Sequence, residues 1–488
     1  MIKIENKITN QKVLERATKR AKEKNIILPT FKQMKDPSLI PQKIKDQLKN
    51  IGLWDLHPLN LFRITWKNEP VEKGGLYSEA NHLVIPPELS GVKAKIVFIL
   101  GKYFPTGAHK VGAAFGCLAP RIVKGEFDPT AQKAVWPSTG NYCRGGAFDS
   151  YLMGVDAVAI LPEGMSKERF DWLHEIGAEV IATPGTESNV KEIYDKCWDI
   201  KQNRKDCVIF NQFEEFGNPT WHYNVTGNAL EEAYNKVKSD KSHLRAFISA
   251  TGSAGTIAAG DYLKTKHPNM KIVATEALQC PTLLNNGFGA HRIEGIGDKH
   301  IPWIHNVKST DVVEAIDDEN CMRMLRVFNE PEGKEMLIEN GIKKELVEKL
   351  NLLGISGISN LLASIKTAKY FEMNENDIIL TVATDSAHMY QSRIVELQEE
   401  QKEKYSKVKA LVDWERYMLG YSTDYMQELT YVDKKRIHNL KYFTWVEQQG
   451  RSSEDLNQLW YDDELWHKIF TQNEELDKLI ENFNSLSS

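Results

Sequence analysis

The chain has 488 residues, more than one ordinary domain needs, so two or three folded units are expected. Hydrophobic residues make up 41% and charged residues 26%, as in water-soluble globular proteins, and a net charge of -5 without any basic block argues against nucleic acid as a partner. No apolar run is long enough for a membrane span, and the N-terminus is polar, so a cytoplasmic protein is expected. The six cysteines are scattered and form no C-x-x-C pair, which predicts reduced thiols and no metal site.

The order of apolar and amphipathic segments predicts an α/β fold. Residues 1–54 alternate Lys, Glu and aliphatic residues, which indicates an N-terminal helical layer. Strands with helices between them are then expected at 96–100, 134–136, 156–161, 178–182, 207–210, 246–250, 271–275 and 378–383. This order is typical of doubly wound parallel sheets, and we expect two such domains, 55–220 and 221–395. Residues 396–488 are charged and then rich in aromatic residues, which indicates a C-terminal helical extension.

Lys110 stands where the strand at 96–100 has ended and an apolar helix begins. The eight residues after it, 111–118, carry no charge. A buried ammonium has a lowered pKa, so this position favours an amine that acts as a nucleophile or a base. The alternative is a lysine at a helix entry whose charged end reaches water.

A turn of small residues, Thr-Gly-Ser-Ala-Gly-Thr at 251–256, follows the strand at 246–250. Its glycines let backbone N–H groups converge at the start of the next helix, which predicts a phosphate cup. Residues 251–256 are called the phosphate cup. The turn lacks both the Walker and the G-x-G-x-x-G pattern, so a nucleotide is disfavoured, and a pure packing role is the alternative. A buried lysine and a phosphate cup in an α/β protein together suggest pyridoxal phosphate.

Further motifs follow one another in a fixed order. They lie at 105–110, 138–141 (Ser-Thr-Gly-Asn, named the carboxylate loop), 211–213, 251–256, 289–297 (named the glycine loop), 354–357 and 385–390. In this order they resemble the fold-type-II pyridoxal phosphate enzymes of the cysteine synthase and cystathionine β-synthase family, over about residues 55–395. The lysine segment Gly107-Ala108-His109 is closer to that of tryptophan synthase β.

The resemblance implies a role for each site residue. Cofactor binding falls to Lys110, which forms the Schiff base, and to Asn141, Gly252, Ser253, Ala254, Gly255, Thr256 and Ser386. Substrate binding falls to Ser138, Thr139, Gly140, Gln212 and Gly295. Ser386 is the expected partner of the pyridine nitrogen, and its neighbour Asp385 is the alternative. Lys110 and Asp298 are the expected catalytic groups, Asp298 as a base for the incoming nucleophile, with an ordinary surface-loop aspartate as the alternative.

The implied activity is β-elimination or β-replacement on cysteine, serine or an O-activated serine through an aminoacrylate, as in a cysteine synthase or cysteine lyase. The alternatives are a tryptophan synthase β-like or a threonine synthase/ammonia-lyase-like reaction, or a regulatory subunit that binds pyridoxal phosphate without turnover. A homodimer is expected. The aromatic extension is expected to cover the core, with a partner-subunit surface as the alternative.

Overall fold

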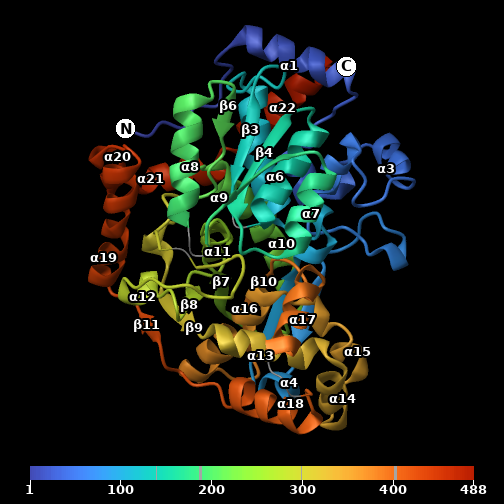
Figure 1. Ribbon diagram of the computed structural model, residues 1–488, viewed down its shortest axis with the longest axis vertical. Helices are drawn as coiled ribbons and strands as arrows, with labels where there is room; N and C mark the ends of the chain where they lie inside the picture. The colour runs from blue at the N-terminus through green and yellow to red at the C-terminus, as the bar shows by residue number, and fades with distance from the viewer. Residues whose placement is uncertain (139, 186–189, 298, 401–403, 488) are drawn as a thin grey trace.

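The structure of the protein, a computed structural model, describes residues 1–138, 140–185, 190–297, 299–400 and 404–487. It contains two β-sheets surrounded by helices, with the smaller sheet above the larger one in Figure 1. This is the predicted mixed α/β architecture.

The large sheet has seven strands in the order β1-β2-β10-β7-β8-β9-β11. Their bounds are β1 (His82–Ile85), β2 (Lys95–Leu100), β7 (His243–Ala250), β8 (Lys271–Ala277), β9 (Val312–Ile316), β10 (Asp377–Ala383) and β11 (Met426–Glu428). The two edge strands, β1 and β11, pair antiparallel, and the inner strands run parallel. Every residue of β10 and β9 is buried, because helices cover both faces of the sheet.

The small sheet has four parallel strands in the order β5-β4-β3-β6. Their bounds are β3 (Lys133–Pro137), β4 (Asp156–Pro162), β5 (Glu179–Thr183) and β6 (Cys207–Ile209). All strands expected from the sequence are present, with ends shifted by at most a few residues. The sequence missed β1, β9 and β11. Two of these are short edge strands, and the acidic residue Glu314 interrupts the apolar run of β9.

The two sheets do not correspond to the two domains expected from the sequence, 55–220 and 221–395. β1 and β2 precede the whole small sheet in sequence but pair within the large sheet. The chain therefore starts the large sheet, crosses into the small sheet, and returns after residue 221. A division that follows the sheets joins residues 82–100 to residues 243–383.

Helices pack on the faces of both sheets (Figure 1). Before and around the small sheet these are α1 (Gln11–Glu23), α2 (Phe31–Lys35), α3 (Gln42–Leu48), α5 (Lys110–Val123), α6 (Asn141–Leu152), α7 (Lys167–Glu175), α8 (Val190–Asn203) and α9 (Gly217–Trp221). Around the large sheet they are α4 (Pro87–Ser90), α10 (Gly227–Val237), α11 (Ile257–Lys264), α12 (Thr282–Asn285), α13 (Asp318–Asn329), α14 (Pro331–Glu339), α15 (Lys344–Val347), α16 (Ile355–Tyr370) and α17 (Gln391–Glu400). α5 is buried along most of its length, as its apolar sequence predicted, and it packs between α6 and α9.

The C-terminal extension is mainly helical, as predicted. It contains α18 (Lys407–Trp414), α19 (Tyr431–Lys441), α20 (Ser453–Tyr461), α21 (Asp463–Thr471) and α22 (Asn473–Ser487). In Figure 1 it runs from the bottom of the molecule, along the left side, to α22 at the top. There α22 packs against α1 and α5. The extension therefore covers parts of both sheet units, and its β11 completes one edge of the large sheet.

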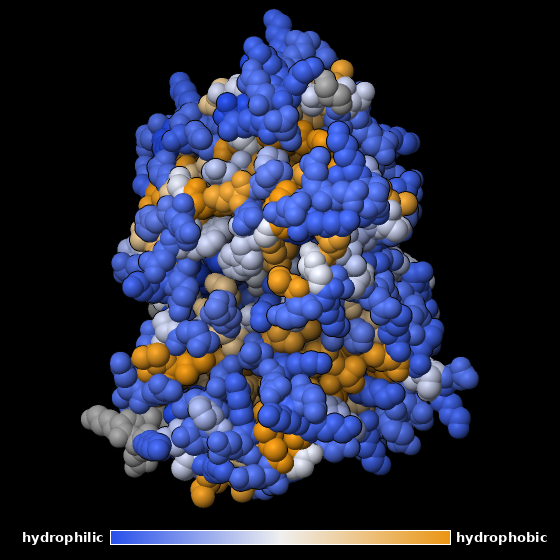
Figure 2. All heavy atoms as spheres, turned by 90° about the vertical axis from the view of Figure 1, so that its right-hand side faces the viewer, coloured by the Kyte–Doolittle hydropathy of each residue, from blue (hydrophilic) through white to orange (hydrophobic). Residues whose placement is uncertain are grey.

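Within the described ranges, no helix combines the length and apolar character needed to cross a lipid bilayer. Figure 2 shows a face that is mostly hydrophilic, with apolar side chains gathered largely in its lower half.

Candidate active site

Lys110 is the first residue of α5 and lies where the chain passes from the large sheet to the small one. The connection before it is closely packed: a Cβ on Gly101 would lie 2.1 Å from the backbone oxygen of Thr384, so only glycine fits where β2 and β10 end. Thr106 has a φ of 66°, and its buried hydroxyl has no hydrogen-bond partner among the described residues. A strained non-glycine residue of this kind is typical of a functional site.

Neutral side chains hold the Lys110 amine. Nζ donates to Gln212 Oε1 at 3.2 Å and to Ser253 Oγ at 3.2 Å. Gln212 Nε2 donates in turn to Ser138 Oγ at 3.2 Å, and Asn218 Nδ2 donates to Ser253 Oγ at 3.1 Å. The structure thus links Lys110 to the carboxylate loop through Gln212 and to the phosphate cup through Ser253.

The phosphate cup connects β7 to α11, as predicted. A Cβ on Gly255 would lie 2.1 Å from Asn218 Oδ1, so the backbone must approach that side chain closely. Among the described residues, the amides of Ser253, Ala254 and Thr256 donate to no protein acceptor. Unpaired amides at the start of a helix are the groups that bind phosphate in other proteins.

The carboxylate loop lies between β3 and α6. Ser138 Oγ accepts a hydrogen bond from the Gly140 amide at 3.2 Å. Gly140 has a φ of 149°, and a Cβ there would lie 2.3 Å from Arg169 Nη1, so the guanidinium packs against the loop backbone. Asn141 is buried as the first residue of α6. Thr139 lies outside the described residues.

The predicted partners of the pyridine nitrogen differ in their contacts. Asp385 is fully buried, and its Oδ2 accepts from Asn141 Nδ2 at 2.6 Å and from the Tyr390 hydroxyl at 2.7 Å. Burial raises the pKa of Asp385, and the hydrogen bond from Tyr390 opposes that rise. Ser386 is 3% exposed, and the structure gives its hydroxyl no partner among the described residues. Its neutral hydroxyl is therefore available to a ligand, while one oxygen of Asp385 is engaged.

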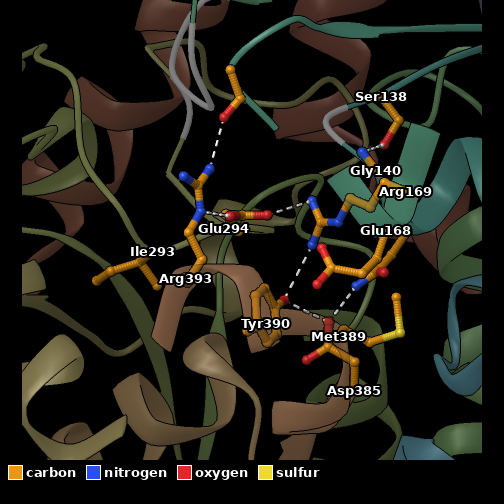
Figure 3. Close-up of polar contacts among 12 residues, drawn as sticks. Ser138, Gly140, Glu168, Arg169, Ile293, Glu294, Asp385, Met389, Tyr390 and Arg393 are labelled. Atoms are coloured by element: carbon orange, nitrogen blue, oxygen red, sulfur yellow. Dashed lines mark hydrogen bonds and ion pairs between the residues drawn. The ribbon is translucent and has the colours of Figure 1, made fainter. Parts of the chain in front are cut away.

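A buried ion network that the sequence did not reveal lies beside these residues (Figure 3). Arg169 Nη1 lies 3.0 Å from Glu294 Oε2, with side-chain exposures of 0% and 3%. Glu294 Oε1 lies 2.7 Å from Arg393 Nε, and Arg169 Nη2 donates to the Tyr390 hydroxyl at 3.2 Å. The network joins α7, the glycine loop and α17, three segments that no spacing pattern relates.

The glycine loop also touches the phosphate cup. A Cβ on Gly252 would lie 2.8 Å from the backbone oxygen of Gly295, and the Gly297 amide donates to Thr251 O at 2.9 Å. The structure therefore places Gly295 next to the cup. Asp298, the predicted base, lies outside the described residues.

Two buried histidines lie close to Lys110. The rings of His109 and His222 meet edge to face with centroids 5.0 Å apart, and burial holds the pKa of both well below the usual range. Both are therefore neutral at physiological pH.

Cys143 lies near the carboxylate loop and is buried. Burial raises the pKa of its thiol to about 12, which leaves the thiol unreactive.

The residues present fit pyridoxal phosphate. Lys110 offers an amine for its aldehyde, and the phosphate cup offers unpaired amides for its phosphate. Asn141 Oδ1 and Asn218 Oδ1 are buried without a partner among the described residues, which is typical of a site that a polar ligand completes. Of the predicted site residues, Gln212 and Ser253 contact the Lys110 amine, and Ser138 contacts Gln212. Gly295 lies against Gly252 of the phosphate cup, and Asn141 contacts Asp385, the neighbour of Ser386.

Comparison with known proteins identifies the family of the chain. Residues 83–335 match the family described as "Pyridoxal-phosphate dependent enzyme". Cysteine synthase of Staphylococcus aureus strain Mu50 is 29% identical over 289 residues, which cover 59% of this chain and 84% of the relative. Cystathionine beta-synthase of Saccharomyces cerevisiae is 26% identical over 328 residues, covering 64% of this chain and 59% of the relative.

Solved structures show the same fold. O-acetylserine sulfhydrylase isoform 3 of Entamoeba histolytica has a TM-score of 0.55 and 24% identity, covering 68% of this chain and 92% of that one. A hydrogen sulfide-producing enzyme of Fusobacterium nucleatum has a TM-score of 0.54 and 24% identity, covering 63% and 95%. The chain belongs to the family of pyridoxal phosphate-dependent enzymes, with cysteine synthases and cystathionine β-synthase among its relatives.

Proposed function

We propose that the protein catalyses β-elimination or β-replacement on a small amino acid such as cysteine, serine or an O-activated serine. One observation carries the proposal: the Lys110 amine lies between the carboxylate loop and the phosphate cup, hydrogen-bonded to Gln212 and Ser253. The relatives named cysteine synthase support the substrate class.

Pyridoxal phosphate, when bound, supplies an electron sink that weakens bonds at the Cα atom of an amino acid. Lys110 is the residue that would hold it covalently through Nζ. When its amine is free, Lys110 would act as the base that takes up the Cα proton of a bound amino acid. Gln212 and Ser253 hold this amine in place, because both accept hydrogen bonds from it. The phosphate cup, with Gly252, Ala254, Gly255 and Thr256, would hold the phosphate through its backbone amides.

The neutral hydroxyl of Ser386 is our choice for the partner of the pyridine nitrogen. Asp385 Oδ2 already accepts hydrogen bonds from Asn141 and Tyr390, and Asp385 Oδ1 lies against Gly354, which supports this choice. A neutral partner does not protonate the nitrogen, so the ring withdraws electrons less strongly. Expulsion of a group from Cβ is then favoured over transamination.

Binding of the substrate carboxylate is assigned to the carboxylate loop and its neighbours. Ser138 and Gln212 carry side-chain donors there, and Gly140 a backbone amide. Thr139 and Gly295 complete the proposed set. Asp298 stays the sequence-based candidate for the base that deprotonates the incoming nucleophile.

The test uses purified full-length protein loaded with pyridoxal phosphate. Release of sulfide and pyruvate from cysteine identifies elimination, and formation of cysteine from O-acetylserine and sulfide identifies replacement. Lys110→Ala should abolish either reaction. Lys102→Ala, in the same connection between β2 and α5, should retain it. Turnover by Lys110→Ala at the wild-type rate, or no reaction of the wild type with any of these amino acids, contradicts the proposal.

The homodimer and the cytoplasmic location stay predictions. Light scattering coupled to size exclusion measures the first, and fractionation of source cells the second. The assignment to the lyase or the transferase class follows from the products of the test above.

A further inference from the structure

The C-terminal extension contacts residues 301–305 through a buried lysine and a buried tryptophan. Lys441, the last residue of α19, is fully buried, and its Nζ donates to the backbone oxygens of Trp303 at 2.9 Å and His305 at 2.7 Å. Four residues later, Trp445 Nε1 donates to the backbone oxygen of Ile301 at 2.8 Å. The extension thus holds three backbone carbonyls within residues 301–305.

This segment lies beside the proposed site. It follows the glycine loop in sequence, and Gly297 at the end of that loop donates to Thr251 of the phosphate cup. On its other side, the Ile304 amide donates to the backbone oxygen of Phe213 at 3.3 Å. Phe213 is next to Gln212, which contacts the Lys110 amine. Residues 301–305 therefore connect to both the glycine loop and Gln212.

Aromatic contacts strengthen the same connection. The Trp445 ring lies 6.1 Å from Trp303 and 6.1 Å from Tyr194 of α8, measured between ring centroids. Tyr194 in turn meets Phe213 edge to face at 6.1 Å. One side chain of the extension therefore contacts both a helix of the small-sheet unit and residues 301–305.

Burial of the Lys441 amine lowers the free energy of unfolding, and packing alone does not explain why a lysine occupies this position. Burial lowers the pKa of Lys441 well below its usual range. Its titratable neighbours His305 and His438 have pKa values lowered to about 3 and about 2, so both are neutral. Within the described ranges no carboxylate pairs with Lys441. A methionine would fill the space without this penalty, so the donors of Lys441 are the feature that the site uses.

We propose that Lys441 and Trp445 are positioning residues for the reaction: they fix residues 301–305 and, through them, the place of the glycine loop and Gln212 relative to Lys110. This role rests on the proposed function for the reaction it serves. It assigns a function to residues 396–488, which lie outside the part of the chain that matches the family, residues 83–335.

The experiment compares three variants of the full-length, cofactor-loaded protein. Lys441→Met keeps the aliphatic stem but removes the donors, and Trp445→Phe keeps an aromatic ring but removes Nε1–H. Lys435→Met is the control, because Lys435 is on the same helix but lies over the rings of Trp460 and Tyr461. Each protein is measured by amide hydrogen exchange and by steady-state kinetics.

We expect the peptide that covers residues 301–307 to exchange about 10- to 100-fold faster in Lys441→Met, because two hydrogen bonds to buried carbonyls are lost. A smaller increase is expected in Trp445→Phe and none in Lys435→Met. The KM for the amino acid should rise about tenfold while kcat changes less, because the change affects where the substrate is held and leaves Lys110 in place. Cofactor content should stay at the wild-type level.

Unchanged exchange at 301–307, or an unchanged KM, in folded Lys441→Met overturns the inference. If Lys441→Met does not fold, hydrogen exchange at 301–307 and the KM of Trp445→Phe test the inference in its place. A wild-type protein that turns over none of the amino acids contradicts the proposed function instead, and the exchange result then still tests whether the extension holds residues 301–305.

Discussion

The side chain of Asn141 donates a 2.6 Å hydrogen bond to Asp385 Oδ2, across 244 residues of sequence. Asn141 opens α6 beside the small sheet, and Asp385 follows β10 of the large sheet. Both side chains are buried, and the same carboxylate oxygen accepts from Tyr390. The bond therefore ties the two sheet units together at the site, directly beside the proposed partner of the pyridine nitrogen, Ser386.

Removal of this bond should weaken both the fold and the site. Asn141→Ala leaves a buried carboxylate with one donor fewer, so we expect a loss of about 1–3 kcal/mol in the free energy of unfolding. Affinity for pyridoxal phosphate should fall as well, because Asn141 is a proposed cofactor contact. Urea unfolding and cofactor titration measure the two effects. Asn235→Ala, at an exposed asparagine of α10, is the control and should change neither. Equal behaviour of both variants would contradict the assignment.

The phosphate cup should not tolerate a side chain at Gly255. Gly255→Asp places a Cβ within 2.1 Å of Asn218 Oδ1 and a negative charge where the amides would meet a phosphate. Loss of the helix-end interaction alone is worth about 0.3–1 kcal/mol, and the charge repulsion adds to it. We expect at least a tenfold weaker Kd for pyridoxal phosphate. Gly341→Asp adds the same charge between α14 and α15, where the φ of 87° strains any side chain but a Cβ meets nothing within 4 Å, and it should leave the Kd unchanged. Full cofactor affinity in Gly255→Asp would place the phosphate elsewhere.

The sequence predicted the parts of the site that depend on local structure. A strand that ends in small residues before a helix can bring backbone amides together, so residues 251–256 could be named as a candidate cup without the fold. The same holds for Lys110, because an uncharged helix after a buried strand leaves its amine little water. These features depend on neighbours in the chain, which a single sequence shows directly.

Contacts between distant segments could not be predicted in this way. Arg169 and Glu294 form a buried pair, but each lies in a charged, helical or loop stretch that looks solvent-exposed in the sequence. Lys441 is similar: its helix carries several lysines and an arginine, and only the fold shows which of them is buried. The order of the large sheet, in which β2 joins β10, likewise depends on pairing that no local pattern encodes.

Glu276 should make the stability of the protein fall as the pH rises. Its carboxyl accepts hydrogen bonds from the amides of Leu283 and Leu284, but burial raises its pKa to about 8. An unfolded glutamate has a pKa of about 4.3. The folded state thus binds the proton more tightly, and its stabilising contribution is complete below about pH 4.3 and is lost as the pH rises to about 8.

Glu276→Gln removes this titration. The free energy of unfolding of the wild type minus that of the variant should therefore decrease between about pH 4.3 and pH 8 and level off above. Urea unfolding at several pH values measures the difference. A constant difference for Glu276→Gln over this pH range would show that its pKa is not raised.

The last prediction concerns the ion pair of Arg169 and Glu294. Arg169→Met leaves the buried Glu294 with Arg393 alone and also removes a donor from Tyr390, so we expect a loss of about 3 kcal/mol in the free energy of unfolding. Arg204→Met is the control: its partners Glu179 and Asp206 are 41% and 48% exposed, and surface contacts of this kind contribute about 0–1 kcal/mol.

The double variant Arg169→Met/Glu294→Met separates the pair from the packing of each side chain. Removal of both charges avoids an unpaired buried carboxylate, so the combined loss should be smaller than the sum of the two single losses by about 1–3 kcal/mol. Urea unfolding of the four proteins gives this coupling energy. Because Arg169 also packs against Gly140, both variants that lack Arg169 should bind the substrate amino acid more weakly, whatever their stability. Strictly additive losses, with an unchanged substrate affinity, would show that the pair is a packing feature without influence on the carboxylate loop.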